Sequence, residues 1–240
     1  MRKGLRHVLT GASAIAALAV TYSAASAGGF AVREQSATHQ GASFAGNAAG
    51  GSLAAMFWNS AAAALAPAGI YSESHYSAIL ANSEITGDAS VGGVSLGLPR
   101  NSDNIADPAV VPASYMSYRI SPNLVAAIAI TSPFGLVTEP NNRFWAGQTF
   151  ARTSEIKTYN FNPTLAYKLS PTFSIGVGLV IEHMEGRLKS ASGVTATSRN
   201  LVIRGDDTAF GFTAGVLWQP NAGTSIGLGY RSSIDHTLEG

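Results

Sequence analysis

The stretch "FSIGVGLVIE", residues 173–182, decides the fold. Apolar residues recur in it at every second position: Phe173, Ile175, Val177, Leu179 and Ile181. Serine, glycine and glutamate occupy the positions between them, with Val180 as the exception. Successive side chains of a β-strand point to opposite faces, so this pattern predicts a strand with one continuous apolar face. That face is about as long as a tilted strand needs to cross a bilayer, about ten residues.

The same alternation recurs in residues 159–169, 208–218 and 224–231. The second face of these segments carries Gly, Asn and Thr in place of Lys and Glu. A soluble β-sandwich also alternates, but it buries its apolar face and exposes charge, and it stays the alternative. The pattern therefore favours an all-β fold, a transmembrane antiparallel β-barrel with small and polar residues toward the lumen.

The composition narrows the functional classes. Charged residues make up 12% of the chain, about half the usual share in soluble domains. The absence of cysteine excludes disulfides, a lipid-modified cysteine and thiolate zinc sites. The five histidines are scattered, so we predict no metal and no cofactor, and a net charge of +1 gives no case for nucleic acid.

Turn residues divide the chain into seven expected strands. Tight turns at 121–123, 170–172 and 220–223 alternate with long polar stretches, an asymmetry typical of outer-membrane barrels. The expected strands are 69–87, 108–120, 124–139, 153–169, 173–190, 206–219 and 224–239. Aromatic residues near the tight turns predict an interfacial girdle, namely Tyr118, Tyr167, Phe173 and Trp218. Seven strands leave the barrel unclosed, so we expect a partial barrel over residues 69–240.

The first 27 residues have the layout of a secretory signal peptide. Arg2, Lys3 and Arg6 precede an apolar run over 12–20, and the triplet 25–27 is an A-x-A cleavage site. The run is too short for a permanent helical span, although a retained anchor is the alternative. The predicted division is therefore a signal peptide over 1–27, an N-terminal segment over 28–68 and the barrel strands after it.

That N-terminal segment resembles the mature N-terminus of the FadL/TodX (OmpP1) family. The stretch "GGFAVREQSATHQGASFAGNAAGG", residues 28–51, is followed by "FWNSAAAALAP". The matching residues are Gly29, Phe30, Glu34 and Ser36, then Gly41, Ala45 and Gly46, then Asn59 and Ala61. The family usually has proline where this chain has Ser60. Residues 130–140, "ITSPFGLVTEP", also resemble a family segment, the one that kinks at the end of the third strand.

The resemblance implies an outer-membrane channel for long-chain fatty acids or other hydrophobic small molecules. Family barrels have about fourteen strands, so this chain looks like the N-terminal half. In the family the N-terminal segment is a hatch inside the lumen, which assigns Gly29, Glu34, Gly41, Gly46 and Asn59 to that hatch. The alternative is a disordered periplasmic tail. The partners implied are the hydrophobic substrate, outer-membrane lipids and the barrel-assembly machinery.

The same resemblance implies passive diffusion that ends in a sideways exit through the barrel wall. The exit is expected at the strand-three kink, Ser132, Pro133, Phe134 and Gly135. Pro133 removes a ladder hydrogen bond and Gly135 permits a bend, whereas an ordinary strand-end turn is the alternative.

Four aromatic residues of the N-terminal segment are candidates for the substrate pocket, namely Phe30, Phe44, Phe57 and Trp58. Alternatively, they only anchor the segment to the wall. A fatty-acid head group in an apolar pocket needs a cation or several donors. Arg187 and Lys189 lie where the family has a basic ligand, but alternation places both on the outer face. Arg231 points into the lumen by the same count, with Glu182 as its possible partner, either as a substrate ligand or as a brace for the hatch.

The sequence gives weaker support to other functions. Two short stretches match motifs of serine enzymes: "GVSLG", residues 93–97, and "SEIK", residues 154–157. The first lacks the helix that its motif requires and the second lacks its companion motifs, so we expect no enzyme. An outer-membrane lipase is the enzymatic alternative. A general porin would line its lumen with charge, which this chain lacks, and a purely structural or adhesive barrel would need no hatch.

Overall fold

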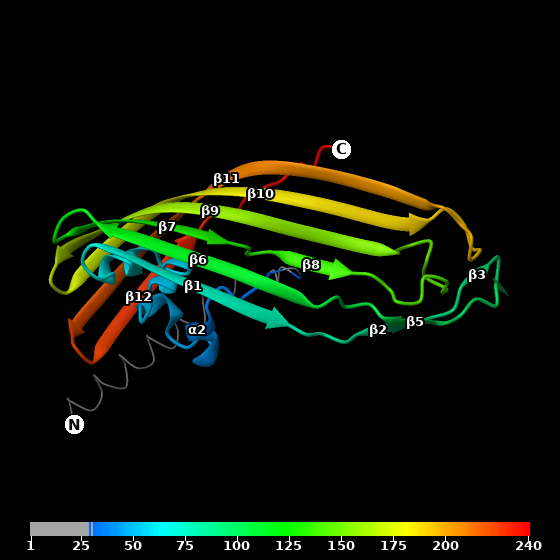
Figure 1. Cartoon of the computed structure of the whole chain (residues 1–240), viewed down its shortest axis with the longest axis horizontal. Coiled ribbons are helices and arrows are strands. Elements are labelled where there is room, and N and C mark those ends of the chain that lie inside the picture. The colour runs from blue at the N-terminus through cyan, green and yellow to red at the C-terminus, as the bar shows by residue number, and fades with distance from the viewer. Residues whose placement is uncertain (1–28, 30) are drawn as a thin grey trace, which may run out of the picture. The chain divides into compact units, whose positions relative to one another are not determined.

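The alternating segments form one antiparallel sheet, with the strand order β1-β6-β7-β9-β10-β11-β12 (Figure 1). Its strands are β1 (Ile70–Ile79), β6 (Ala109–Arg119), β7 (Leu124–Thr131), β9 (Thr153–Ser170), β10 (Phe173–Ala191), β11 (Asn200–Asn221) and β12 (Thr224–Arg231). A further strand, β8 (Gly135–Thr138), pairs with β9. Two short hairpin-like pairs, β2 (Glu84–Thr86) with β5 (Asn101–Asn104) and β3 (Ser90–Val91) with β4 (Val94–Ser95), lie outside the sheet.

This computed structural model describes Gly29 and residues 31–240. The expected signal peptide and Phe30 lie outside the described residues. Residues Val32–Gly240 form one unit, to which the following description refers.

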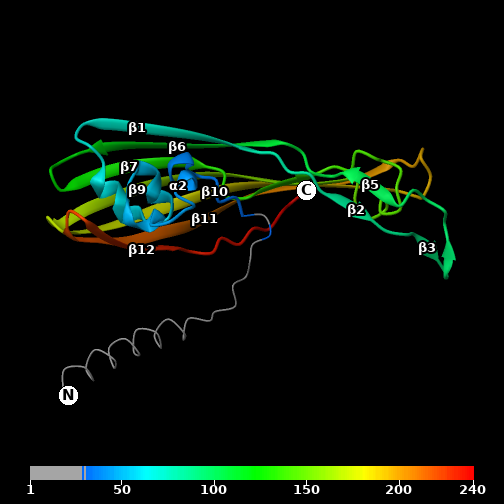
Figure 2. The same ribbon diagram turned by 90° about the horizontal axis from the view of Figure 1, so that it is seen from below.

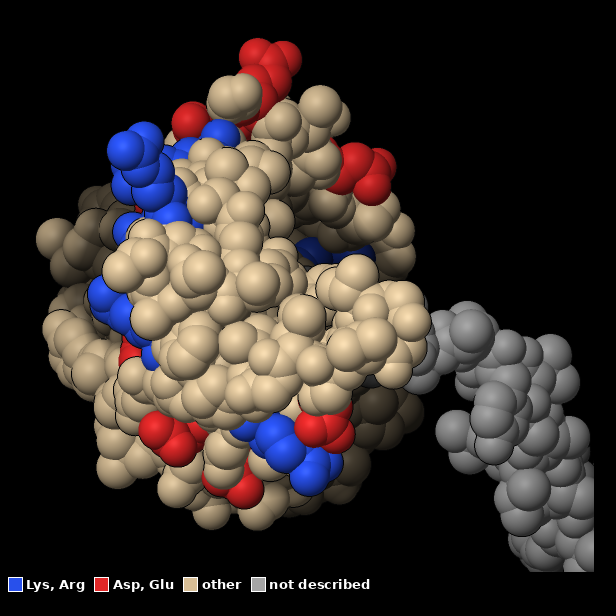
Figure 3. Space-filling model, turned by 90° about the vertical axis from the view of Figure 1, so that its right-hand side faces the viewer, with Lys and Arg blue, Asp and Glu red and all other residues tan. Residues whose placement is uncertain are grey.

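Tight turns join β6 to β7, β9 to β10 and β11 to β12 at one end of the sheet, and long connections lie at the other (Figure 1). Figure 3 looks at the loop end, where Lys, Arg, Asp and Glu lie mainly around the margin and uncharged residues cover the middle. The predicted asymmetry between short turns and long loops is thus present.

One face of the sheet is apolar and exposed. The register places Tyr118, Ala126, Leu165, Val177 and Ala214 in one row across β6 to β11. Similar rows lie above and below it, and their exposed members include Met116, Leu179, Phe212, Val216 and Leu228. An apolar surface this continuous requires an apolar solvent, as a lipid-facing wall has.

The height of the apolar face fits a bilayer. It runs along β10 from Phe173, opposite Trp218, to His183, opposite Tyr159. Ten residues at about 3.4 Å each give about 34 Å along the strand, and a tilt of about 40° reduces this to about 26 Å, close to the usual apolar band. The exposed aromatic residues Tyr118, Tyr167 and Trp218 lie toward the tight turns, as the girdle prediction requires.

Several strand boundaries differ from the expected ones. The first strand ends at Ile79, and residues 84–86 pair separately with β5. The strand expected from 206 begins at Asn200, because β10 offers a pairing edge up to Ala191 and extends the hairpin. The last strand ends at Arg231 and not at 239, since the Ser232 hydroxyl accepts the hydrogen bond of the Phe212 N–H in place of a ladder carbonyl.

The N-terminal segment lies against the opposite, inner face of the sheet (Figure 2). It contains α2 (Ala37–Gly41) and three 3₁₀ helices, η1 (Asn47–Ala49), η2 (Leu53–Phe57) and η3 (Ser60–Leu65). Its buried residues join inward-facing strand residues in one core, formed by Leu53, Ala54, Met56, Ala63, Ala64, Ala66, Ala113, Tyr115, Val125, Ala127, Ala129 and Ala166. No helix among the described residues is both long and apolar enough to cross a membrane.

Four inward-facing glycines seat this segment. A Cβ added at Gly176 would meet the backbone of Ser60 and Ala61, and one at Gly229 would meet the Trp58 carbonyl. In the same way, a Cβ at Gly215 would meet the Asn59 side chain, and one at Gly227 would meet the Ala48 carbonyl. The small residues expected to line a lumen therefore allow one backbone to approach another.

We predict that Gly176→Ala loosens the N-terminal segment, because its methyl group meets rigid backbone and the segment must shift. Overpacking of this kind typically costs about 1–3 kcal/mol. Limited proteolysis should cut residues 32–66 faster than in the wild type. Gly223→Ala is the control, since its Cβ would make only an ordinary contact of 3.6 Å with Asn221. Equal cleavage of the two variants would contradict the seating role.

Candidate functional site

Three of the predicted substrate-binding aromatic residues come together in the N-terminal segment. The ring centroids of Phe44 and Phe57 lie 6.0 and 5.1 Å from that of Trp58, and His39 lies 5.1 Å from the same ring. All three predicted residues are half-buried. They form an aromatic cluster within the segment, and Phe57 also packs against the buried core.

Arg231 completes this cluster from β12. Its guanidinium lies 4.7 Å from the Phe57 ring centroid, and its Nη2 donates to the Phe57 carbonyl at 3.3 Å. Its Nη1 is buried and has no hydrogen-bond partner among the described residues. The inward direction predicted for this arginine is therefore observed, together with one unused donor.

The expected pairing of Arg231 with Glu182 is absent from the ion pairs of the described residues. Glu182 instead accepts a hydrogen bond from Asn160 at 3.0 Å and lies 3.3 Å from His236 Nε2. Arg187 faces outward, as the alternation predicts, and pairs with Glu155 on β9.

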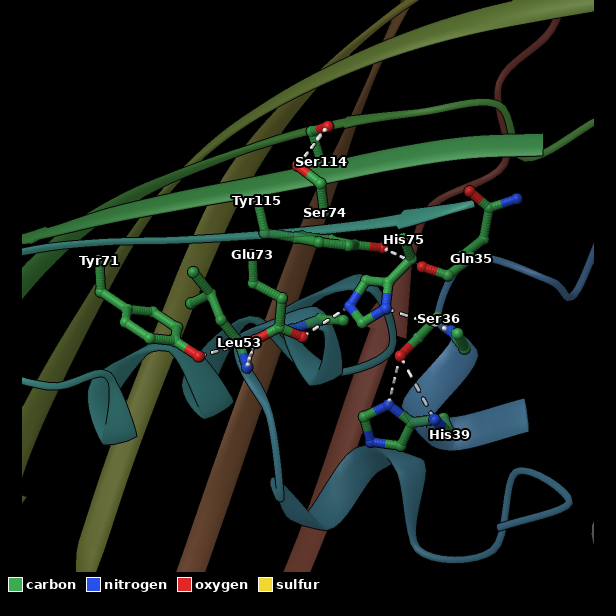
Figure 4. Close-up of polar contacts among 12 residues, drawn as sticks. Gln35, Ser36, His39, Leu53, Tyr71, Glu73, Ser74, His75, Ser114 and Tyr115 are labelled. Carbon is green, nitrogen blue, oxygen red and sulfur yellow. Dashed lines mark hydrogen bonds and ion pairs between the residues drawn. The ribbon is translucent and has the colours of Figure 1, made fainter. Parts of the chain in front are cut away.

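Two side chains on β1, Glu73 and His75, hold the backbone of the N-terminal segment (Figure 4). Glu73 accepts hydrogen bonds from the backbone of Leu53 at 2.9 Å and of Ala54 at 3.3 Å, and it lies 2.7 Å from His75 Nε2. His75 Nδ1 accepts from the Ala37 N–H at 3.3 Å, so the proton of a neutral ring lies on Nε2. Two strand residues therefore satisfy three backbone donors of the segment.

Asn59 links the segment to β11. Its Oδ1 accepts from the Ala61 N–H at 3.0 Å and caps η3, while its Nδ2 donates to the carbonyls of Ala48 at 2.7 Å and Val216 at 2.9 Å. The turn that the family makes with proline is thus made here with Ser60 as the first residue of η3.

The other predicted hatch residues have smaller roles in the structure. Gly46 has φ 69° and caps η1, a conformation that favours glycine. Gly41 ends α2 and is exposed, with open space at its Cβ position. Glu34 is half-buried, and Gly29 lies in an exposed turn.

The predicted kink is a break in the sheet. β7 pairs with β9 as far as Thr131, opposite Asn160, and β8 resumes at Gly135, opposite Lys157. Three residues, Ser132 to Phe134, therefore stand against two on β9, which is a β-bulge.

The break also interrupts the wall between β6 and its neighbour. The β6–β7 ladder ends at Ser114 opposite Ile130, and among the described residues the next contact of this kind is the bridge between Ala106 and Thr138. Residues Ala109–Ala113 of β6 pair with β1 alone. The wall thus contains a gap beside Ser132 and Pro133.

The N-terminal segment covers this gap from the inside. The Val32 N–H donates to the Pro133 carbonyl at 2.8 Å. The Gln35 side chain donates to the Ser132 carbonyl at 2.8 Å and accepts from its N–H at 3.3 Å. Gln35 is fully buried, and its own carbonyl accepts a hydrogen bond from Tyr115 at 2.8 Å. Residues that precede the first strand therefore satisfy the backbone groups that the bulge leaves unpaired.

Known proteins match this chain over most of its length. The profile of the family described as "Outer membrane protein transport protein (OMPP1/FadL/TodX)" matches residues 18–240. The chain belongs to this family. Its relatives include the long-chain fatty acid transport protein of Escherichia coli O6:H1, 29% identical over 65% of this chain and 39% of that protein. Outer membrane protein P1 of Haemophilus influenzae is 24% identical over 88% of this chain and 54% of its own length.

A solved structure supports the fold. The crystal structure of a Pseudomonas aeruginosa FadL homologue superposes with a TM-score of 0.67 at 20% identity, over 87% of this chain and 54% of that one. This FadL-family chain spans about two fifths to one half of the length of the relatives it matches. Like them, it is an outer-membrane protein, and its exposed apolar face is the lipid-facing side of a transmembrane β-barrel sheet.

Sequence reasoning missed several residues that hold the FadL-family segment in place, above all Gln35, Glu73, His75 and Tyr115. Glu73 and His75 occupy alternate positions of β1 that face inward. The same alternation that predicted the inward direction of Arg231 could therefore have identified them. Gln35 had no such signal, because it lies outside any strand.

We predict that Glu73→Gln loosens the backbone at the start of η2. A glutamine amide cannot accept from Leu53, Ala54 and His75 together, and hydrogen bonds to a charged group are worth about 1.5–3 kcal/mol each. Hydrogen exchange measured by mass spectrometry should become faster at residues 53 and 54. Glu185→Gln, on the outer face, should leave that exchange unchanged. Protection equal to the wild type in Glu73→Gln would show that the carboxylate does not hold the segment.

Proposed function

We propose that this chain forms part of an outer-membrane channel for the passive uptake of long-chain fatty acids or other hydrophobic small molecules. Substrate leaves it sideways, through the wall at Ser132 to Gly135. The observation that carries this proposal is the gap between β6 and β8, covered from the inside by Val32 and Gln35. The names of the relatives, which include long-chain fatty acid transport proteins, support the substrate class.

In this proposal the N-terminal segment, from residue 28 to the first strand, is a hatch that follows a cleaved signal peptide. Its contacts with the wall at the gap are made by two residues, Val32 and Gln35, whereas η1 and η3 contact β9 to β12 and rest on the seating glycines. Movement of residues 32–35 alone opens the gap while η2 and η3 stay docked. An apolar molecule then passes from the inner face into lipid without crossing water.

The proposed binding site before the exit is the cluster of Phe44, Phe57, Trp58 and Arg231. The aromatic rings offer an apolar surface to an acyl chain, and the unpartnered Nη1 of Arg231 offers a donor to a carboxylate. Phe30 is assigned to the same pocket by its place in the sequence.

The sideways exit is tested by a reversible tether. The Val32 Cγ2 atom lies 3.7 Å from the position of a Cβ at Gly135, and the chain has no native cysteine, so Val32→Cys with Gly135→Cys gives one defined disulfide. Oxidation pins residue 32 over the gap. Uptake of radiolabelled fatty acid by cells should fall at least tenfold on oxidation and return on reduction.

The two single-cysteine variants are the controls and should keep their uptake under both conditions. A double variant that carries the disulfide, shown by its changed migration on a gel, and still takes up fatty acid at the reduced rate would exclude an exit at this gap.

The head-group ligand is tested by substituting Arg231. Loss of one charge-assisted hydrogen bond costs about 1.5–3 kcal/mol, which corresponds to a Kd about 10- to 100-fold weaker. Arg231→Ala should show this loss for a fatty acid but not for the fatty alcohol of the same chain length. The pair Arg187→Ala and Lys189→Ala, on the outer face, should bind both normally. Equal losses for acid and alcohol would mean that Arg231 only braces the segment through Phe57.

A further inference from the structure

Beyond the apolar band, toward the long loops, the outer face of the sheet changes from apolar to charged. The next two rows of outward residues are charged on all three strands β9, β10 and β11. The first row consists of Lys157, Glu185 and Asp206, and the second of Glu155, Arg187 and Arg204. These rows follow Tyr159 and His183 directly, so they lie at the level of lipid head groups.

The second row brings two arginines face to face. Arg187 and Arg204 are directly opposite cross-strand partners, and like charges in this position are destabilising. An anion placed between the two guanidinium groups offsets this repulsion.

Glu155 supplies that anion for one arginine alone. It pairs with Lys157 and with Arg187. The hydrogen bond from Lys157 lowers the pKa of the Glu155 carboxyl most, the nearby Arg187 lowers it less, and burial opposes both. Arg204 makes no side-chain hydrogen bond or ion pair within the described part of the chain. The Nε of Arg187 is buried and also has no partner there. Donors from both arginines are therefore unused.

These side chains line a groove of about 490 Å³ on the outer face. Below it on the same strands lies a second groove, of about 1150 Å³, lined by outward apolar residues that include Leu165, Val177, Leu179 and Phe212. The small residue Ala214 lies in the floor of the lower groove. A groove with two arginines at its upper edge thus lies toward the loop end of the strands, and an apolar groove lies toward the tight turns.

We propose that this surface is a binding site for a membrane lipid with a phosphate in its head group. Arg187 and Arg204 bind the phosphate, and an acyl chain lies along β10 and β11 toward the apolar groove. From Arg187 to Ile181 is six residues, about 20 Å along the strand, which an extended acyl chain can follow. Guanidinium groups bind phosphate through two parallel hydrogen bonds, which suits a pair of arginines with free donors.

The neighbouring acidic residues decide which form of phosphate binds. Glu185 and Asp206 face each other in the row below and repel any anion. Free phosphate is therefore bound weakly, and the apolar contacts of a lipid supply the remaining affinity. This proposal concerns the outer wall and does not depend on what passes through the channel.

The test is native mass spectrometry of the protein extracted from outer membranes in detergent. The probes are phosphatidic acid, diacylglycerol with the same acyl chains, and inorganic phosphate. The wild type should retain phosphatidic acid at least tenfold better than diacylglycerol, and inorganic phosphate at the same concentration should not displace it.

Arg204→Gln is the informative variant, because this side chain makes no polar contact with any other described residue. It should lose at least tenfold in retention of phosphatidic acid, and the double variant with Arg187→Gln should lose more. Arg143→Gln removes an exposed arginine from a loop and should bind like the wild type.

Three outcomes would overturn the proposal. They are equal retention by the wild type and Arg204→Gln, equal retention of phosphatidic acid and diacylglycerol, and displacement by inorganic phosphate at the concentration of the lipid.

Discussion

The two-residue period of the β-strand governs this molecule, because it assigns each strand residue to one of two environments. Odd positions of β10 from 173 to 181 face outward, and even positions from 174 to 182 face the inside of the sheet. A shift of one residue exchanges the two sets, and every strand would then present glycine and asparagine to lipid. The register is therefore fixed by solvation on both sides of a single layer, and the layer needs no second sheet to cover its apolar face.

On the inner face, polar groups need hydrogen-bond partners because they lie away from water. Glu73 and His75 find them in backbone groups of the segment. In return, Asn59 of the segment donates to the Val216 carbonyl of β11, and Gln35 donates to the Ser132 carbonyl of the bulge. The irregular backbone of the segment is satisfied in the same exchange, which is the condition for non-helical chain at membrane depth. Segment and wall are therefore complementary in hydrogen bonding as well as in shape.

The sequence predicts those features that depend on local period. The outward directions of Leu179, Phe212 and Trp218 and the inward direction of Arg231 follow from parity. The kink at Ser132 to Gly135 was placed by the family resemblance and not by local period. Features that depend on distant partners were missed. β11 begins six residues early because its neighbour is long, β12 ends at Arg231 because a serine side chain competes for the ladder, and Glu182 pairs with Asn160 and His236 in place of Arg231. No pattern within a single strand carries information of that kind.

The glycine seat has a consequence for the order in which the molecule is assembled. Asn59 and the Val216 carbonyl are separated by 157 residues, and the seat beneath residues 48–61 is built from β10, β11 and β12. The part of the chain that is made first therefore cannot reach its final position until the last of these strands is in place. Contacts between such distant residues form slowly, because the intervening chain must be ordered first. Until then residues 48–61 can dock only on the earlier strands, so their final packing is a late step of folding.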